Sequence, residues 1–389
     1  MFSFDAPTLE LSGDRFGVVY TITGDEKEAY SKARDICLEQ TVEFPGELLF
    51  PQGTIAGNIV GRIEEFEPYG ENSYQFVISY AVETAAGEFT QLLNVIFGNI
   101  SLKPGIRLER VLLTEPILQN FRGPRFGREG LRQLLGIEKR PLLFTALKPM
   151  GLPADELAEL AYQFALGGID IIKDDHGLSD QPFSPFARRV ELCAGAVHRA
   201  NRETGKRCIY VPNITASHGE IIRKARFAKE LGAGGLLISP ALTGFDAMRD
   251  VAEDDGIALP IFAHPAFAGS YVVSANSGIS HYALFGQLNR LGGADGTVYP
   301  NFGGRFSFTL EECLNIAEGT KAPIGVLKTI FPCPAGGMSL ESIPESVRVY
   351  GNDVILLVGG GLFKHGPDLV ENCRYFNRLV DKLMVPGMT

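Results

Sequence analysis

Residues 141–175 read PLLFTALKPMGLPADELAELAYQFALGGIDIIKDD: a short apolar run, an amphipathic stretch of helix length, and a second apolar run that ends in charged residues. In the middle stretch, apolar residues recur at a spacing of three to four, which predicts a helix. The two apolar runs have the length and composition of strands buried on both faces, as in a parallel sheet. The stretch therefore predicts a strand, a helix and a second strand parallel to the first.

The same alternation continues to the end of the chain. The candidate strands are PLLFTALK from 141, GIDIIKDD from 168, KRCIYVPNIT from 206, GGLLISPAL from 234, LPIFAHP from 259, DGTVYP from 295, PIGVLKTI from 323 and DVILLVGGG from 353. About eight such strands make a (β/α)8 barrel. A doubly wound open sheet shares the local pattern, but the GxGxxG fingerprint after a first strand is missing, so the barrel is favoured.

The first part of the chain has a different pattern. FGVVYTI at 16–22 and YQFVISYAV at 74–82 alternate as strands do, and EKEAYSKARDICLEQ at 26–40 has helical spacing. We predict an α/β protein with a smaller N-terminal α+β domain at 1–125. A C-terminal (β/α)8 TIM barrel at 126–389 would carry the active site.

The composition excludes several classes of function. A net charge of -10 and the lack of a basic run argue against a nucleic-acid partner, because such binding needs clustered Lys and Arg. No apolar run approaches the roughly 20 residues of a membrane span, and residues 1–16 lack the pattern of an export signal. Six scattered cysteines fit reduced thiols better than a disulfide scaffold. We expect a cytoplasmic enzyme.

The strongest candidate site is IIKDDH, at the end of the second barrel strand, because barrel active sites lie at the C-terminal ends of the strands. Alternation along the strand points Lys173 and Asp175 into the barrel mouth, with Asp174 outward and His176 at the loop start. These three mouth residues would suit a divalent ion such as Mg2+ if Lys173 reacted with CO2 to become an anionic carbamate. The alternative is a surface-facing charged loop with an internal Lys–Asp pair.

Other strand ends supply further polar side chains. Lys148 follows the first strand, where a partly desolvated amine could act as a general base beside a carbonyl. His264 follows the fifth strand and could move a proton or bind substrate hydroxyls, or be a hydrogen-bonded core histidine. Asn213 follows the third strand, as a substrate or metal-shell ligand or as a turn cap.

Two glycine turns follow the seventh and eighth strands, where barrel enzymes commonly hold phosphate through backbone N–H groups. Gly336 and Gly337 belong to the first turn, and Gly359 and Gly360 to the second. Either turn alone is explained better as a tight connection. The pair together predicts a phosphorylated small-molecule substrate.

These residues resemble those of a known family. GGIDIIKDDH followed by QPFSPFARRV resembles the metal-site segment of the large subunit of ribulose bisphosphate carboxylase (RuBisCO). The resemblance covers nearly the whole chain and includes, in order, EQTVEFP, LLNVIFGN, GPRFG, LKPMGL, FAHPAF and the AGG and VGGG turns. Because it departs from the carboxylase motifs at several positions, the chain is similar to the RuBisCO-like proteins rather than to true carboxylases.

The resemblance implies the RuBisCO large-subunit fold and a homodimer in which one subunit's N-terminal domain completes its partner's site. Glu39 and Asn99 would be the contributions of that domain. In the barrel, Lys173 matches the carbamylated lysine and Asp175 the next metal ligand, while His176 stands where carboxylases have glutamate. The remaining matches are Lys148 to the enolisation lysine, His264 to the strand-five histidine, and Gly336, Gly337, Gly359 and Gly360 to the phosphate-site glycines.

Three departures remove what carboxylation of a bisphosphate requires. The second lysine of the carboxylase KPK motif is replaced by Met150, and NFGGRFSF after the sixth strand has no lysine, with Arg305 a doubtful substitute. Pro265 replaces the arginine that holds a second phosphate, and proline has no N–H to donate. We expect a substrate with one phosphate and no carboxylase activity.

RuBisCO-like proteins share an enediolate intermediate but differ in reaction. We rank the isomerisation of 5-methylthioribulose 1-phosphate, a reaction of methionine salvage, first. A decarboxylase or hydrolase of a branched 3-oxo sugar acid, of the 3-oxo-isoapionate 4-phosphate type, comes second. The 2,3-diketo-5-methylthiopentyl-1-phosphate enolases resemble the chain less, since they carry a lysine where Asn99 stands. A non-catalytic regulatory relative is the remaining alternative, and turnover assays with magnesium separate it from the enzymes.

Overall fold

The computed structural model describes residues 9–49 and 53–384, and it divides into two compact units. The N-terminal unit comprises the residues up to Phe121 together with Ala268–Gln287 and Pro323–Val326. The barrel unit comprises Arg122–Phe267, Leu288–Ala322 and the chain from Leu327 onward. Residues 1–8, on which part of the expectation about an export signal rests, lie outside the described residues.

The N-terminal unit is built on a sheet with the order β10-β4-β1-β3-β2, in which β1 pairs antiparallel with both β3 and β4. Asp25 caps the N-terminus of α1, because its side chain accepts a hydrogen bond from the N–H of Glu28, and the helix buries Ala29, Ala33 and Ile36. The strands are β1 (Arg15–Thr23), β2 (Arg62–Pro68), β3 (Ser73–Ala81), β4 (Ile106–Leu112) and β10 (Gly278–Ile279). The helices are α1 (Glu26–Glu39), α2 (Thr54–Asn58), α3 (Phe89–Phe97), α4 (Glu115–Leu118) and α11 (Gly269–Val272).

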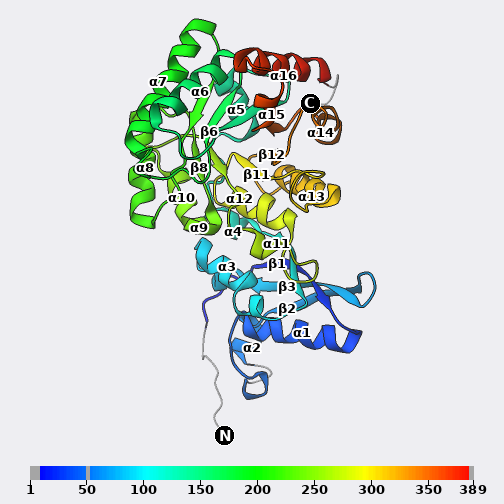
Figure 1. The fold of residues 1–389 in the computed structure, drawn as a ribbon. Helices are drawn as coiled ribbons and strands as arrows, with labels where there is room; N and C mark the ends of the chain where they lie inside the picture. The colour runs from blue at the N-terminus through cyan, green and yellow to red at the C-terminus, as the bar shows by residue number, and fades with distance from the viewer. Residues whose placement is uncertain (1–8, 50–52, 385–389) are drawn as a thin grey trace. The chain divides into compact units, whose positions relative to one another are not determined.

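The barrel unit contains two four-stranded parallel sheets, with the orders β13-β5-β6-β7 and β12-β11-β9-β8. A parallel bridge between Asn213 and Leu237 joins the sheets at one seam, and β12 lies next to β13 at the other. The strands are β5 (Leu142–Leu147), β6 (Ile171–Asp174), β7 (Ile209–Val211), β8 (Leu236–Ile238), β9 (Ile261–Ala263), β11 (Gly296–Pro300), β12 (Phe331–Ala335) and β13 (Ile355–Leu357). This arrangement is the predicted barrel (Figure 1).

Helices connect the strands and surround them (Figure 1). The main ones are α5 (Gly127–Leu135), α6 (Ala154–Leu166), α7 (Phe186–Thr204), α8 (His218–Glu230), α10 (Phe245–Glu253), α13 (Leu310–Lys321), α14 (Ile343–Tyr350) and α16 (Leu369–Leu383). Shorter segments are α9 (Pro240–Thr243), α12 (Asn289–Leu291) and α15 (Gly361–Lys364). The π-helical η4 (Tyr282–Leu288) belongs to the N-terminal unit up to Gln287. Among the described residues, no helix combines the length and apolar character that a bilayer crossing requires.

Alternation along the strands divides the apolar side chains of the barrel unit into two buried clusters. One cluster lies inside the barrel and includes Leu142, Phe144 and Ile171. The other lies between the strands and the helices and includes Leu143 and Ile172. Because side chains two residues apart face the same side of a strand, this division determines the direction of the polar residues that follow.

The seventh strand is not where the sequence pattern placed it. The segment 323–330 was predicted as a strand but is irregular, and the strand is β12, five residues that include Pro332 and Pro334. The N–H of Phe331 donates to Asp295 O on the β11 side. Because the N–H direction alternates along a strand, the backbone nitrogens of Pro332 and Pro334 face the opposite side, away from β11. No ladder joins β12 to β13 there, which is why the sheet tolerates two residues without an N–H.

Candidate active site

Lys173 is a buried amine at the end of β6. It follows Ile171 of the barrel interior by two residues, so its side chain projects to the barrel side of the strand. The side chain is 2% exposed, and its Nζ donates to the backbone oxygen of Asp174 at 2.9 Å. Burial lowers the pKa of the amine to about 8. The charge of Asp175 opposes this shift, and the charge of Lys148 adds to it. The uncharged amine, which is the form that reacts with CO2, is therefore far more populated near neutral pH than in an ordinary lysine.

Asp175 lies at the centre of the charged cluster. Its Oδ1 is 2.7 Å from Lys148 Nζ and 3.5 Å from His176 Nδ1. Burial alone raises the pKa of this carboxyl, but its contacts with His176 and Lys148 outweigh burial and hold the pKa well below its usual value. No described donor meets Oδ1 with hydrogen-bond geometry, and the cation that faces this buried oxygen is Lys148.

His264, at the end of β9, stacks on His176 with ring centroids 4.4 Å apart and planes 15° from parallel. The N–H of Ala266 donates to His264 Nδ1 at 3.2 Å, so the neutral ring carries its proton on Nε2. Burial, followed by the charges of Lys173 and His176, holds the pKa of His264 well below the usual value. His264 is therefore a neutral imidazole at pH 7.

The residues predicted for a metal site do lie together, and they fit a divalent ion on one condition. Within the described residues, no three His, Cys, Asp or Glu side chains gather as a ready metal site. Asp175 supplies a carboxylate oxygen that now pairs with Lys148, and His176 supplies an imidazole close to it. A carbamate on Lys173 would add the hard oxygen ligands that Mg2+ prefers. The donor set fits magnesium only after that reaction.

The two glycine turns differ in what their backbones require. Gly336 and Gly337 have φ angles of 83° and 101°, which residues other than glycine rarely adopt. Gly359 and Gly360 have no left-handed backbone, and a Cβ on either would meet no atom within 4 Å. At Gly359 and Gly360 the second turn therefore has no structural need for glycine, and open space lies above the backbone there.

The comparisons with known proteins agree on one family. Residues 127–371 match the family model described as the ribulose bisphosphate carboxylase large chain, catalytic domain. The 5-methylthioribulose-1-phosphate isomerase of Rhodospirillum rubrum is 38% identical over 93% of this chain and 95% of its own length. The chain belongs to the RuBisCO large-chain family.

Other relatives of this RuBisCO-like protein bear different names. A 2,3-diketo-5-methylthiopentyl-1-phosphate enolase of Bacillus licheniformis is 34% identical over 84% of this chain and 81% of its own length. The crystal structure of a Rubisco-like protein from Rhodopseudomonas palustris is 38% identical, with a TM-score of 0.86 over 96% of this chain and 99% of that one. The fold is thus the RuBisCO large-subunit fold, and the family typically uses Mg2+ with a carbamylated lysine.

The positions at which this RuBisCO-like chain departs from carboxylases border the site. Met150 is 53% exposed, and its sulfur lies next to Gly177, just after His176. In the loop after β11, the guanidinium of Arg305 lies over the Phe306 ring, 5.0 Å from its centroid. The resemblance leads to an expectation of a lysine in each of these two segments in a carboxylase, and the side chains present here are a methionine and an arginine stacked on a phenylalanine.

Glu39 and Asn99 are brought together within the N-terminal unit. Asn99 Nδ2 donates to Glu39 Oε1 at 3.0 Å and to Glu43 Oε1 at 3.3 Å. An amide at this position has no basic nitrogen, so it can orient a ligand but cannot remove a proton.

Asn213 supports the chain rather than pointing a free group into the mouth. Its Nδ2 donates to the backbone oxygens of His176 and Leu178, both at 2.9 Å, and its Oδ1 accepts from Thr215 N at 3.1 Å. The amide nitrogen thus holds the loop after β6, and the amide oxygen caps the turn after β7, as in the turn-cap alternative.

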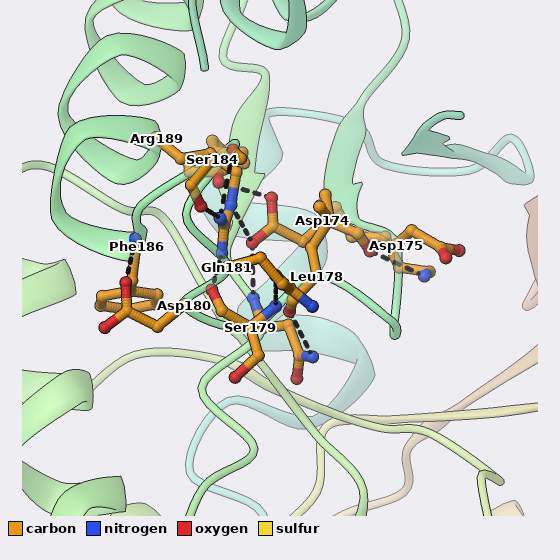
Figure 2. Close-up of polar contacts among 12 residues, drawn as sticks. Asp174, Asp175, Leu178, Ser179, Asp180, Gln181, Ser184, Phe186 and Arg189 are labelled. Carbon is orange, nitrogen blue, oxygen red and sulfur yellow. Dashed lines mark hydrogen bonds and ion pairs between the residues drawn. The ribbon is translucent and has the colours of Figure 1, made fainter. Parts of the chain in front are cut away.

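Two buried charged residues beside the site were not predicted to act there. Asp174 and Arg189 have no exposed side-chain area and form an ion pair of 3.1 Å on the outer side of β6 (Figure 2). The sequence did contain a sign that Arg189 is buried, because it falls three residues after Phe186 and one before Val190, on the apolar face of the predicted helix. Its partner was not visible in the sequence, because it lies on a different element.

Proposed function

We propose that this chain is a metal-dependent enzyme that enolises and isomerises a phosphorylated keto-sugar, with 5-methylthioribulose 1-phosphate as the first candidate substrate. The observation that carries the proposal is the cluster at the barrel mouth, where Lys148 and Asp175 pair at 2.7 Å beside the buried amine of Lys173. A buried lysine costs stability and has no structural use here, so a chemical role explains it. The identity to the Rhodospirillum rubrum isomerase over nearly the full length supports the reaction type.

The carbamate of Lys173, Asp175 and His176 would hold magnesium, and the bound ion would supply polarisation of the substrate carbonyl. Lys148, in its uncharged form, takes a proton from the carbon beside the carbonyl and leaves an enediolate. The neutral ring of His264 carries a proton on Nε2 and can deliver one to the neighbouring carbon or oxygen. One proton leaves and one returns, so the product is an isomer of the substrate.

The glycine turns would hold the single phosphate. Gly359 and Gly360 leave open space above their backbone, and Gly360 precedes the short helix α15. Backbone N–H groups without neighbouring side chains allow a phosphate to approach closely. Pro265, where carboxylases have an arginine, supplies no second phosphate contact.

Family members form dimers with shared active sites, and we propose the same assembly here. Glu39 and Asn99 of one subunit would then orient the substrate bound in the partner's barrel. The 2,3-diketo-5-methylthiopentyl-1-phosphate enolase reaction is the second candidate, favoured by the Bacillus licheniformis relative. It ranks lower because Asn99 cannot serve as a base.

The test is proton NMR of 5-methylthioribulose 1-phosphate in D2O with the protein, magnesium and bicarbonate. We expect deuterium at the carbons flanking the carbonyl and the appearance of an isomeric sugar phosphate. Lys148→Ala should lower the exchange rate by about 100-fold or more, as loss of a general base does. No exchange with the wild-type protein would refute the isomerase. Exchange only with 2,3-diketo-5-methylthiopentyl 1-phosphate would favour the enolase.

A further inference from the structure

Arg189 is a fully buried arginine in the first turn of α7, directly after the loop that follows the proposed metal ligands. Its Nε pairs with Asp174 Oδ2 at 3.1 Å. The second oxygen of Asp174 accepts from the Tyr210 hydroxyl at 2.7 Å, and Oδ2 also accepts from Asn213 N at 3.1 Å. The buried charges are therefore paired on every side, and Arg189 has one fixed position.

The other nitrogens of the guanidinium bind the loop itself. Nη1 donates to Ser184 O at 2.5 Å, and Nη2 donates to Ser179 O at 2.6 Å (Figure 2). The planar group thus joins the end of β6 to two carbonyls of the segment between His176 and α7. A single ammonium cannot match this forked geometry.

The loop held in this way begins at the site. Asp175 and His176 connect β6 to the clamped segment, and Asn213 holds the His176 and Leu178 carbonyls from β7. The side chain of Asp175 can keep its place beside Lys148 only if the backbone on both sides of it is fixed. Asp174 fixes one side and the Arg189 contacts fix the other.

We propose that Arg189, locked to Asp174, is a positioning residue that holds Asp175 and His176 in their site geometry by fastening the loop 177–184 to the barrel. The proposal deepens the proposed function and rests on it for its chemical meaning. The geometric claim is tested without turnover.

The test variant is Arg189→Lys, which keeps a positive charge for Asp174 but cannot bind both loop carbonyls. We expect amide hydrogen exchange in 177–184 to accelerate by about tenfold or more, without a matching change across the rest of the barrel. Acetylation of Lys148 by acetic anhydride, measured by mass spectrometry, should accelerate as well, because the contact with Asp175 at 2.7 Å shields the Lys148 nitrogen in the wild type. Where the wild type is active, kcat should fall about 10- to 100-fold, with KM changed much less.

Arg188→Lys is the matched control, because Arg188 precedes Arg189 on the same helix and pairs with Asp155 at 2.8 Å in an exposed position. It should change none of these quantities. If Arg189→Lys does not fold, Asp174→Asn tests the same clamp from the other partner, since it keeps an acceptor for Tyr210. An unchanged amide exchange rate in 177–184 would overturn the proposal. So would an unchanged rate of Lys148 acetylation in a variant whose loop exchange has accelerated. Failure of the proposed function would appear separately, as absent isotope exchange in the wild type.

Discussion

At the scale of single residues, the buried amine of Lys173 is the clearest sign of function. Lysine is almost never fully buried without a partner, because transfer of its charge out of water is unfavourable. Among the residues that the structure describes, the amine of Lys173 donates to one backbone oxygen and to no side chain, and burial lowers its pKa to about 8. The folded protein therefore tolerates a residue that lowers its stability at neutral pH.

Lys173→Met should stabilise the protein at pH 7 while abolishing metal-dependent turnover. The folded pKa of about 8 lies below the usual value of 10.5, so the destabilisation is full below pH 8 and disappears as pH rises toward 10.5. We expect a gain on the order of 2 kcal/mol in the free energy of unfolding at pH 7, shrinking at higher pH. Urea unfolding in CO2-depleted buffer with a chelator measures it.

Lys139→Met is the control for this prediction, because Lys139 is exposed and should change stability little. A Lys173→Met variant less stable than the wild type at pH 7 would show that the amine contributes favourable contacts. A fully active variant would remove Lys173 from the proposed metal site.

At the scale of elements, the connection from β13 to α15 separates glycines needed for folding from those available for binding. A Cβ on Gly361 would lie 2.6 Å from Met338 O, so that glycine is required by packing. Gly359 and Gly360 have open space instead. Three consecutive glycines thus have two different physical explanations.

Gly360→Ala should weaken binding of the phosphorylated substrate while leaving stability within about 0.5 kcal/mol of the wild type. We expect KM to rise about tenfold, because a methyl group would occupy the space that the phosphate oxygens need. Gly361→Ala should instead destabilise by about 1–3 kcal/mol through its close contact. Isothermal titration with the substrate and urea unfolding separate the two effects. Wild-type affinity in both Gly359→Ala and Gly360→Ala would show that phosphate binds elsewhere.

At the scale of the whole molecule, the proposed dimer makes a prediction about mixed subunits. Asn99→Ala and Lys173→Ala should each be inactive, because each removes one half of every shared site. In a mixed dimer, one of the two sites would combine both unaltered halves. Random exchange makes about half of the dimers mixed, so about a quarter of the wild-type activity should return.

Lys173→Ala mixed with His264→Ala is the control, because both substitutions lie in the barrel and no intact site can form. Recovery in this control, or no recovery with Asn99→Ala, would contradict a site completed by the partner's N-terminal domain. The activities are measured on the whole mixture after subunit exchange. Dimers purified through two different tags, one on each variant, are all mixed and should show about half of the wild-type activity instead.

How much the sequence predicted depends on the range of the interaction. Alternation along a strand directs Lys173 and Asp175 into the mouth, and that prediction needs only the periodicity of one element. The strand at β12 was misplaced because two prolines argue against a strand, and the side of the sheet they face depends on which strands become neighbours. Local patterns also could not predict that Ala268–Gln287 and Pro323–Val326, which interrupt the barrel sequence, belong to the N-terminal unit.

By itself, the sequence determined the repeated strand and helix pattern, the polar residues at the strand ends and membership of the RuBisCO large-chain family. Only the tertiary structure decided which of these residues touch. It paired Lys148 with Asp175, stacked His176 on His264, and engaged Asn213 and Asp174 in holding a loop. The periodicity of a strand or helix predicts the direction in which a side chain points from that element. Which residue the side chain then contacts depends on the packing of elements that are far apart in the chain.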